Sequence, residues 1–202
     1  MNHSSLNPTT TKTQKNLQPN DRREAGKIEV LDGRTSVKHA SNRWNNLITA
    51  NFAIAIGTRI QRNNCEIYAG DMQVQVGKNS VCFPNVVIVS GEPVFNDNRF
   101  EVLQNPTVVI EVFAGSSRSG DRTQKLEGFL SSPSIKEFLL VNQTEMRVEH
   151  YARQNSKQWI YRIYNERDDT ISLDSIQCKL SLSEVYAQVK LGESELGSKT
   201  VH

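Results

Sequence analysis

Residues 83–115 read FPNVVIVSGEPVFNDNRFEVLQNPTVVIEVFAG and contain two short apolar runs, VVIVS at 86–90 and TVVIEVF at 107–113. Their length and their β-branched residues are typical of strands buried in a sheet. Asn85 precedes the first run directly after Pro84, and Glu111 lies in the middle of the second. An ionised carboxylate withdrawn from water costs on the order of several kcal/mol unless a cation, a metal ion or hydrogen bonds compensate it. The sequence therefore predicts a partner for Glu111.

The elements around these two runs predict an α+β fold with a mixed β-sheet flanked by helices. Helical spacing of apolar residues after a possible cap at Ser41 indicates a long helix in 41–64, and a shorter helix is expected in 121–132. Asp32-Gly33 is typical of a tight hairpin turn, and 147–153 with 158–164 alternate as a C-terminal β-hairpin does. Further strands are expected at 65–70, 72–76 and 137–142, and a Ser-x-x-Glu capping box from Ser181 to Glu184 indicates a short closing helix.

Composition favours one domain between two polar tails. Residues 1–26 are rich in Ser, Thr, Asn, Gln and Lys and cannot bury enough apolar surface to order themselves, so we expect a disordered tail, a domain over 27–190 and a second polar tail over 191–202. The net charge of +2 is too small to indicate nucleic-acid binding by itself. Three cysteines without a CxxC pair argue against a disulfide framework, and no apolar run reaches the length of a membrane helix. We expect a cytoplasmic protein that does not contact a membrane.

Four charged residues form a candidate chemical set. Asp71 begins the run DMQVQV one strand before Asn85, and Asp121 and Lys125 are four residues apart, hence on one face of the helix that follows Glu111. The intervening AGSSRSG is flexible enough to fold that helix back over the end of the strand. Two carboxylates on neighbouring strands can hold Mg²⁺, and a lysine can then orient water or neutralise charge. Such a set is suited to the hydrolysis of a phosphodiester.

Several blocks of the chain match a known family in order and spacing. They are GDMQVQV, FPNVVIV, NPTVVIEVFAGSSRSGDRTQKLEGFLSS and EFLLV, and they resemble those of the Uma family of restriction-endonuclease-like proteins in the PD-(D/E)XK nuclease superfamily. The resemblance runs from about Lys27 to Val189. The resemblance implies a restriction-endonuclease-like fold and the cleavage of DNA with Mg²⁺, for which Mn²⁺ can substitute. It also implies a homodimer as a possible assembly.

The resemblance carries over residue by residue with one important departure. Asp71 and Glu111 match acidic metal ligands, Lys125 matches the catalytic lysine, and Asp121 matches a supporting aspartate. Position 85, however, is Asn where the pattern has an aspartate after proline, and an amide brings no negative charge to a metal. In addition, Asn45 takes the place of a histidine that is common in the family.

Each of these residues also has a simpler interpretation. Glu111 and Lys125 can form a structural ion pair, Asp121 and Lys125 a surface pair, and Asp71 and Asn85 can be turn residues. Two hypotheses follow. The chain is a Mg²⁺-dependent endonuclease that uses Glu111, Lys125 and Asp71, or it is a catalytically inactive nuclease-fold protein retained for DNA binding or protein interaction.

Overall fold

The computed structural model describes residues 27–31, 33–38, 41–60, 64–77, 79–96, 98–114 and 119–192, with only the backbone of 119–122. The expected N-terminal tail lies outside the described residues, as does the expected C-terminal tail apart from its first two residues. None of the described helices combines the length and the apolar character that a membrane crossing needs.

The chain forms strands and helices over most of the described residues. The strands are β1 (Lys27–Leu31), β2 (Arg34–Lys38), β3 (Cys65–Ala69), β4 (Gln73–Gln75), β5 (Val81–Cys82), β6 (Val86–Ser90), β7 (Val102–Leu103), β8 (Val108–Phe113), β9 (Glu137–Asn142), β10 (Val148–Arg153), β11 (Trp159–Tyr164), β12 (Thr170–Leu173) and β13 (Cys178–Ser181). The helices are α2 (Arg43–Ile60), α3 (Ser119–Ser131) and α4 (Leu182–Val185), with a 3₁₀ turn η1 (Asp174–Ile176).

The strands belong to three sheets. A six-stranded sheet has the order β11-β10-β9-β8-β6-β3, a five-stranded sheet the order β2-β1-β5-β4-β7, and β12 and β13 form a hairpin. The pairs β8–β9 and β4–β7 are parallel and the other pairs antiparallel, so both larger sheets are mixed. This confirms an α+β fold with a mixed sheet and helices, whereas the second sheet and the β12–β13 hairpin were not expected from the sequence.

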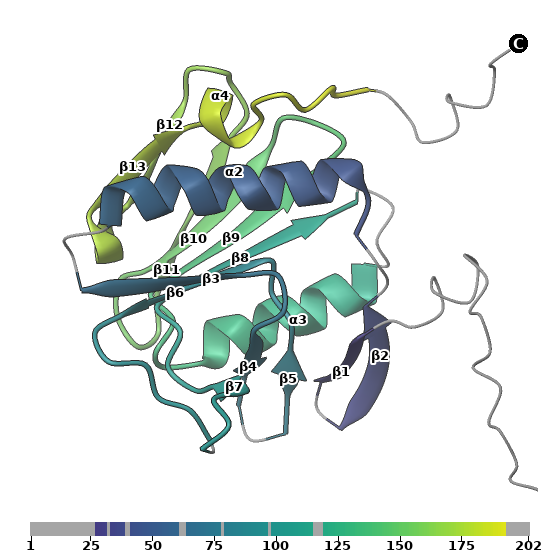
Figure 1. Ribbon diagram of the computed structural model, residues 1–202, viewed down its shortest axis with the longest axis vertical. Helices are drawn as coiled ribbons and strands as arrows, with labels where there is room; N and C mark the ends of the chain where they lie inside the picture. The colour runs from purple at the N-terminus through teal and green to yellow at the C-terminus, as the bar shows by residue number, and fades with distance from the viewer. Residues whose placement is uncertain are drawn as a thin grey trace, which may run out of the picture.

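The central strands β6 and β8 are buried on both faces, because each face of the six-stranded sheet is covered by other elements (Figure 1). Val86, Ile88 and Ile110 point to the core that includes α2, α4 and β12–β13. Val87 and Val109 point to the opposite core, which includes residues of α3 and of the five-stranded sheet. Alternation along β8 therefore directs the side chain of residue 111 to the α3 side.

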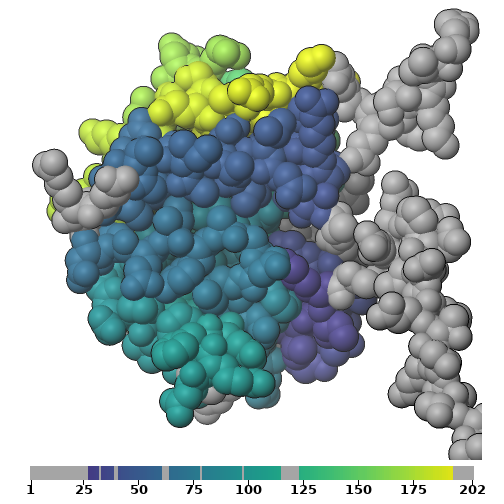
Figure 2. Space-filling view, viewed as in Figure 1, coloured from purple at the N-terminus to yellow at the C-terminus, as the bar shows by residue number. Residues whose placement is uncertain are grey.

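Helix α2 begins one residue later than the sequence suggested. The backbone N–H of Asn45 donates to Oδ1 of Asn42 over 2.9 Å, so Asn42 caps the helix and the expected cap at Ser41 was wrong. The helix packs on the sheet through Ile48, Phe52 and Ile56, which have no exposed surface. In the space-filling view it lies beside the C-terminal segment (Figure 2).

Three local predictions are confirmed. Strands β1 and β2 pair from Leu31–Arg34 outward around Gly33, whose φ of 77° lies in the left-handed region that favours glycine; Asp32 lies outside the described residues. Helix α4 begins with the capping box, in which Oγ of Ser181 accepts from the N–H of Glu184 and the Glu184 carboxylate accepts from the N–H of Ser181. The expected hairpin of β10 and β11 is also present, at one edge of the six-stranded sheet.

Candidate functional site

Glu111 is almost buried in the middle of β8, with 8% of its surface exposed. Its carboxylate meets two ammonium groups. Nζ of Lys125 lies 2.9 Å from Oε1, and Nζ of Lys38 lies 3.3 Å and 3.4 Å from Oε1 and Oε2. The partner that the sequence required for Glu111 is thus present twice, once from helix α3 and once from the end of β2.

Lys125 lies between two carboxylates. Besides Glu111, its Nζ contacts Oε2 of Glu29 on β1 at 2.6 Å. The other oxygen of Glu29, Oε1, accepts from the backbone N–H of Phe83 over 3.0 Å. Helix α3 is thereby joined to β8, to the β1–β2 hairpin and to the segment before β6. Four charged side chains, Glu29, Lys38, Glu111 and Lys125, make up what we call the ion network.

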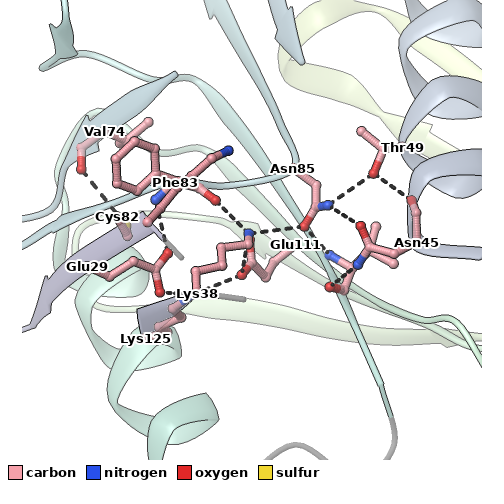
Figure 3. A network of polar contacts seen from close by, with 12 residues as sticks. Glu29, Lys38, Asn45, Thr49, Val74, Cys82, Phe83, Asn85, Glu111 and Lys125 are labelled. Atoms are coloured by element: carbon pink, nitrogen blue, oxygen red, sulfur yellow. Dashed lines mark hydrogen bonds and ion pairs between the residues drawn. The ribbon is translucent and has the colours of Figure 1, made fainter. Parts of the chain in front are cut away.

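The ammonium group of Lys38 is surrounded by oxygen atoms (Figure 3). It donates to the carbonyl of Phe83 over 2.6 Å, and Oδ1 of Asn85 lies at 3.4 Å, in addition to both oxygens of Glu111. Only 18% of the Lys38 side chain and 10% of the Glu111 side chain are exposed. A backbone carbonyl, a side-chain amide and a carboxylate together therefore form an oxygen cage around one cation.

Asn85 connects this cage to helix α2. Its Oδ1 accepts from the backbone N–H of Val112 over 3.0 Å, beside the contact with Lys38. Its Nδ2 donates to Oδ1 of Asn45 over 2.7 Å and to Oγ1 of Thr49 over 3.0 Å (Figure 3). Both ends of the amide are thus used, in a position that is 5% exposed.

The neighbours determine which way both amides point. Oδ1 of Asn85 faces two groups that can only donate, the N–H of Val112 and the ammonium of Lys38. The Nδ2 of Asn45 donates to the carbonyl of Val112 over 3.0 Å, and Thr49 uses its hydroxyl hydrogen on the carbonyl of Asn45. Asn45 and Thr49 consequently present acceptors to position 85. If residue 85 were an aspartate, one of its carboxylate oxygens would face the acceptor oxygens of Asn45 and Thr49. The environment of position 85 therefore matches an amide.

The central pair of the network, Glu111 and Lys125, is held in its ionised form. Burial raises the pKa of Glu111, but the neighbouring Lys38 and Lys125 ammoniums lower it more, and the net pKa lies below the usual range of a glutamate. Burial lowers the pKa of Lys125, but Glu111 and Glu29 raise it further, so the net pKa lies above its usual range. At neutral pH Lys125 therefore carries its proton and cannot serve as a general base.

Of the other two predicted site residues, only Asp71 has a side chain that the structure describes, and its described contacts lie outside the ion network. The carboxylate of Asp71 is 86% exposed and pairs with Lys27, and it lines a shallow surface depression that includes Tyr68 and Phe100. No described contact links Asp71 to Glu111 or Asn85. Asp121 lies in the first turn of α3, but its side chain lies outside the described residues.

As they are arranged, the residues of the network do not fit a divalent metal ion. Among the described residues, no three His, Cys, Asp or Glu side chains gather as a metal site would require. The two carboxylates of the network are already balanced by two ammonium groups. A divalent ion about 4 Å from one ammonium would meet repulsion on the order of 8 kcal/mol at an effective dielectric near 20. The oxygen atoms are of the chemical type that binds a divalent ion, but the ammonium group of Lys38 occupies the space between them.

Sequence reasoning missed Glu29 and Lys38. The signal was present, because Glu29 interrupts the apolar run around Val30 and Leu31 much as Glu111 interrupts its own strand. A two-residue turn after Leu31 pairs Glu29 with Ser36 and Lys27 with Lys38. Since paired residues share a face and side chains alternate, that register directs Glu29 and Lys38 to the same side of the hairpin.

Comparison with known proteins gives one family. A family model described as "Uma2: Putative restriction endonuclease" matches residues 15–184. An uncharacterized protein of Synechocystis, sll1609, is 29% identical over 135 residues, which cover 66% of this chain and 76% of that protein. A second one, slr1290, is 22% identical over 168 residues, or 82% and 86% of the two chains.

A solved structure has a similar fold. It is described as a crystal structure of "a putative nuclease belonging to DUF820" from Anabaena variabilis, and it matches with a TM-score of 0.66 and 14% sequence identity. The match covers 81% of this chain and 91% of the other. At that identity the likeness shows a shared fold.

Proposed function

Because the chain belongs to the Uma2 family, described as putative restriction endonucleases, we propose that it hydrolyses phosphodiester bonds in DNA as an endonuclease. One observation carries the proposal: a carboxylate in the middle of a buried strand, Glu111, and a lysine of the following helix, Lys125, meet at 2.9 Å. The two residues are 14 positions apart, and an ordinary core has no need of either charge at this position.

The side chains of the network have properties suited to this chemistry. A DNA phosphodiester is an anion, and the attack of water adds negative charge to the phosphoryl oxygens. The protonated Lys125 can stabilise that charge electrostatically, which is often the largest contribution to catalysis. The ionised Glu111 can accept a hydrogen bond from the attacking water and orient it. Lys38 donates its hydrogens to the oxygen cage, so it contributes its positive charge to the electrostatic attraction of the phosphate.

No step of this proposal passes through Mg²⁺ or Mn²⁺, the metal ions that the sequence led us to expect. While Lys38 remains at the centre of the oxygen cage, the residues offer no place for a divalent ion with a matching charge. DNA is accordingly proposed to be bound by the ammonium groups themselves.

Nicking of supercoiled plasmid DNA tests the proposal, in parallel reactions with EDTA, Mg²⁺ or Mn²⁺. We expect Glu111→Gln and Lys125→Met to lose activity by about a hundredfold or more, the usual effect of removing one electrostatic stabiliser. Glu127→Gln and Lys157→Met change exposed residues and serve as matched controls. Equal cleavage by all five proteins would mean that the activity comes from elsewhere and would contradict the proposal.

A second candidate function is favoured by the hydrogen bonds of Asn85. Both ends of its amide are engaged with the backbone of β8 and with helix α2, as in a structural position. On this reading the chain is a nuclease-fold protein that does not cleave DNA and is retained for DNA binding or protein interaction. No cleavage by the wild type in any buffer, together with retention of a labelled DNA duplex in a gel-shift assay, would select this alternative.

A further inference from the structure

We infer that Lys38 is the resident cation of this site: its ammonium group takes the position that a divalent metal ion would otherwise occupy, so that the site is complete without a metal. The inference concerns cation binding and does not depend on whether the chain cleaves DNA. It follows from the oxygen atoms around Lys38, from the charges of the network and from the place of Lys38 in the fold.

The donors around Lys38 are those that Mg²⁺ and Mn²⁺ prefer. A backbone carbonyl from Phe83, an amide oxygen from Asn85 and the carboxylate of Glu111 converge on one point from three segments of the chain. Hard oxygen ligands of this mixture are typical of magnesium and calcium sites. An ammonium group is a compact cation with three hydrogens to donate, and it satisfies the same oxygens by hydrogen bonds.

The distances agree with an ammonium and not with a metal. The oxygens lie 2.6 Å to 3.4 Å from Nζ, whereas Mg²⁺ requires oxygens at about 2.0–2.1 Å in a near-octahedral arrangement. A cage that is relaxed around Lys38 is therefore too wide for Mg²⁺ and would have to contract around it.

The charge of the network is balanced with Lys38 included. Glu29 and Glu111 contribute two negative charges, and Lys38 and Lys125 contribute two positive charges, among the side chains that the structure describes there. Removing Lys38 leaves one negative charge without a partner beside three kinds of oxygen ligand. A divalent ion entering that space would find an electrostatic attraction and oxygen ligands of the right type, which would move inward to meet it.

Asn85 has a matching role in this scheme. An ammonium carries one positive charge, and the carboxylate of Glu111 is enough to pair with it when Lys125 is paired with Glu29. A second carboxylate at position 85 would leave an excess of negative charge in a nearly closed site. The amide of Asn85 gives the ammonium an oxygen without adding that charge.

Lys38→Met tests the inference directly, because methionine keeps most of the apolar stem and removes the charge. Binding of Mn²⁺ is measured by titration calorimetry and by electron paramagnetic resonance of free and bound Mn²⁺. We expect one Mn²⁺ per chain in Lys38→Met, at least tenfold tighter than in the wild type, and loss of that binding in Lys38→Met/Glu111→Gln. Lys157→Met, which changes an exposed lysine, is expected to bind Mn²⁺ no better than the wild type.

Two results would overturn the inference. One is a folded Lys38→Met protein, as judged by circular dichroism, that gains no binding. The other is a wild-type protein that already binds Mn²⁺ tightly and loses it in Glu111→Gln. The second measurement needs no Lys38 variant, so the inference can fail even if Lys38→Met does not fold. Neither measurement uses DNA, and a chain without nuclease activity would leave both readouts intact.

Discussion

The side-chain amide of Asn85 donates to that of Asn45 over 2.7 Å, and this contact ties the start of β6 to the first turns of α2. Asn85 is therefore not simply an aspartate that has lost its charge. Its partners use the hydrogen-bond donor that only an amide can provide at this position, since Thr49 and Asn45 both present acceptors. Asn85 departs from the family's sequence pattern, and yet the hydrogen-bonding groups around position 85 match an asparagine.

We expect Asn85→Asp to destabilise the fold for this reason. The substitution replaces two donated hydrogen bonds by contacts between oxygens, in a position that is 5% exposed. An unsatisfied buried group costs about 1–3 kcal/mol, although Lys38 nearby offsets part of the new charge. Urea unfolding at pH 7 measures the loss. An Asn85→Asp protein as stable as the wild type would contradict the hydrogen-bond directions given above.

A histidine at position 45 should restore the hydrogen bonds that Asn85→Asp removes. An imidazolium at 45 offers two N–H donors, one for the carbonyl of Val112 and one for an aspartate at 85. We expect Asn45→His/Asn85→Asp to be more stable than the sum of the two single changes, by about 1 kcal/mol or more. Additive effects of the two substitutions would show that positions 45 and 85 are not coupled in this way.

We expect the presence of Lys38 to limit metal binding more strongly than the identity of residue 85 does. We expect Asn85→Asp alone to gain no stabilisation from Mg²⁺, because the ammonium of Lys38 still fills the cage. In Lys38→Met/Asn85→Asp, Mg²⁺ at about 100 times its dissociation constant should add about 2.7 kcal/mol to the free energy of unfolding. Thermal melts with and without Mg²⁺ measure both. A large shift in Asn85→Asp alone would mean that Lys38 yields to the metal readily.

The pair of Glu111 and Lys125 should behave as a buried ion pair. Removing one partner leaves the other charge uncompensated, and such changes cost about 3–5 kcal/mol. We expect Glu111→Gln and Lys125→Met each to destabilise substantially, and Glu111→Gln/Lys125→Met to cost less than their sum. The remaining ammonium of Lys38 makes Glu111→Gln the more harmful of the two. Equilibrium unfolding of the four proteins in urea gives the coupling free energy, and a value near zero would contradict the pairing.

The sequence was informative about the central strands and about Glu111, and less so about what surrounds it. Apolar runs with a single carboxylate are a strong signal, because the cost of burying that charge demands a cation nearby. Helix α3 and Lys125 follow in the same stretch and were identified with it. The β1–β2 hairpin was also recognised from its turn, and its register places Glu29 and Lys38 on one face, but the surface that this face meets becomes visible only when the hairpin docks beside Phe83.

Asp71 shows the opposite case, since a motif match suggested a metal ligand beside Glu111 and the side chain is exposed and pairs with Lys27. We expect Asp71→Asn to change the free energy of unfolding by less than about 1 kcal/mol, because its only described charged partner is Lys27 at the surface. The same substitution should leave Mn²⁺ binding by Lys38→Met unchanged. Urea unfolding and Mn²⁺ titration check the two statements, and a loss of Mn²⁺ binding would return Asp71 to the site.

The pH dependence of stability should report on Glu111. Its pKa is raised by burial but lowered more by Lys38 and Lys125, so the folded value lies below the unfolded value of about 4.3. Its contribution to stability is therefore fully present above about pH 4.3 and is lost as the pH falls towards the folded pKa, by up to about 1.4 kcal/mol per pH unit. The advantage of the wild type over Glu111→Gln should accordingly shrink as the pH falls below about 4.3 towards the folded pKa, while above about pH 5 the difference stays constant. Urea unfolding of both proteins at each pH isolates this residue, because the other carboxyl groups titrate in both; a difference that grows on acidification would mean that the carboxylate is destabilising in its buried place.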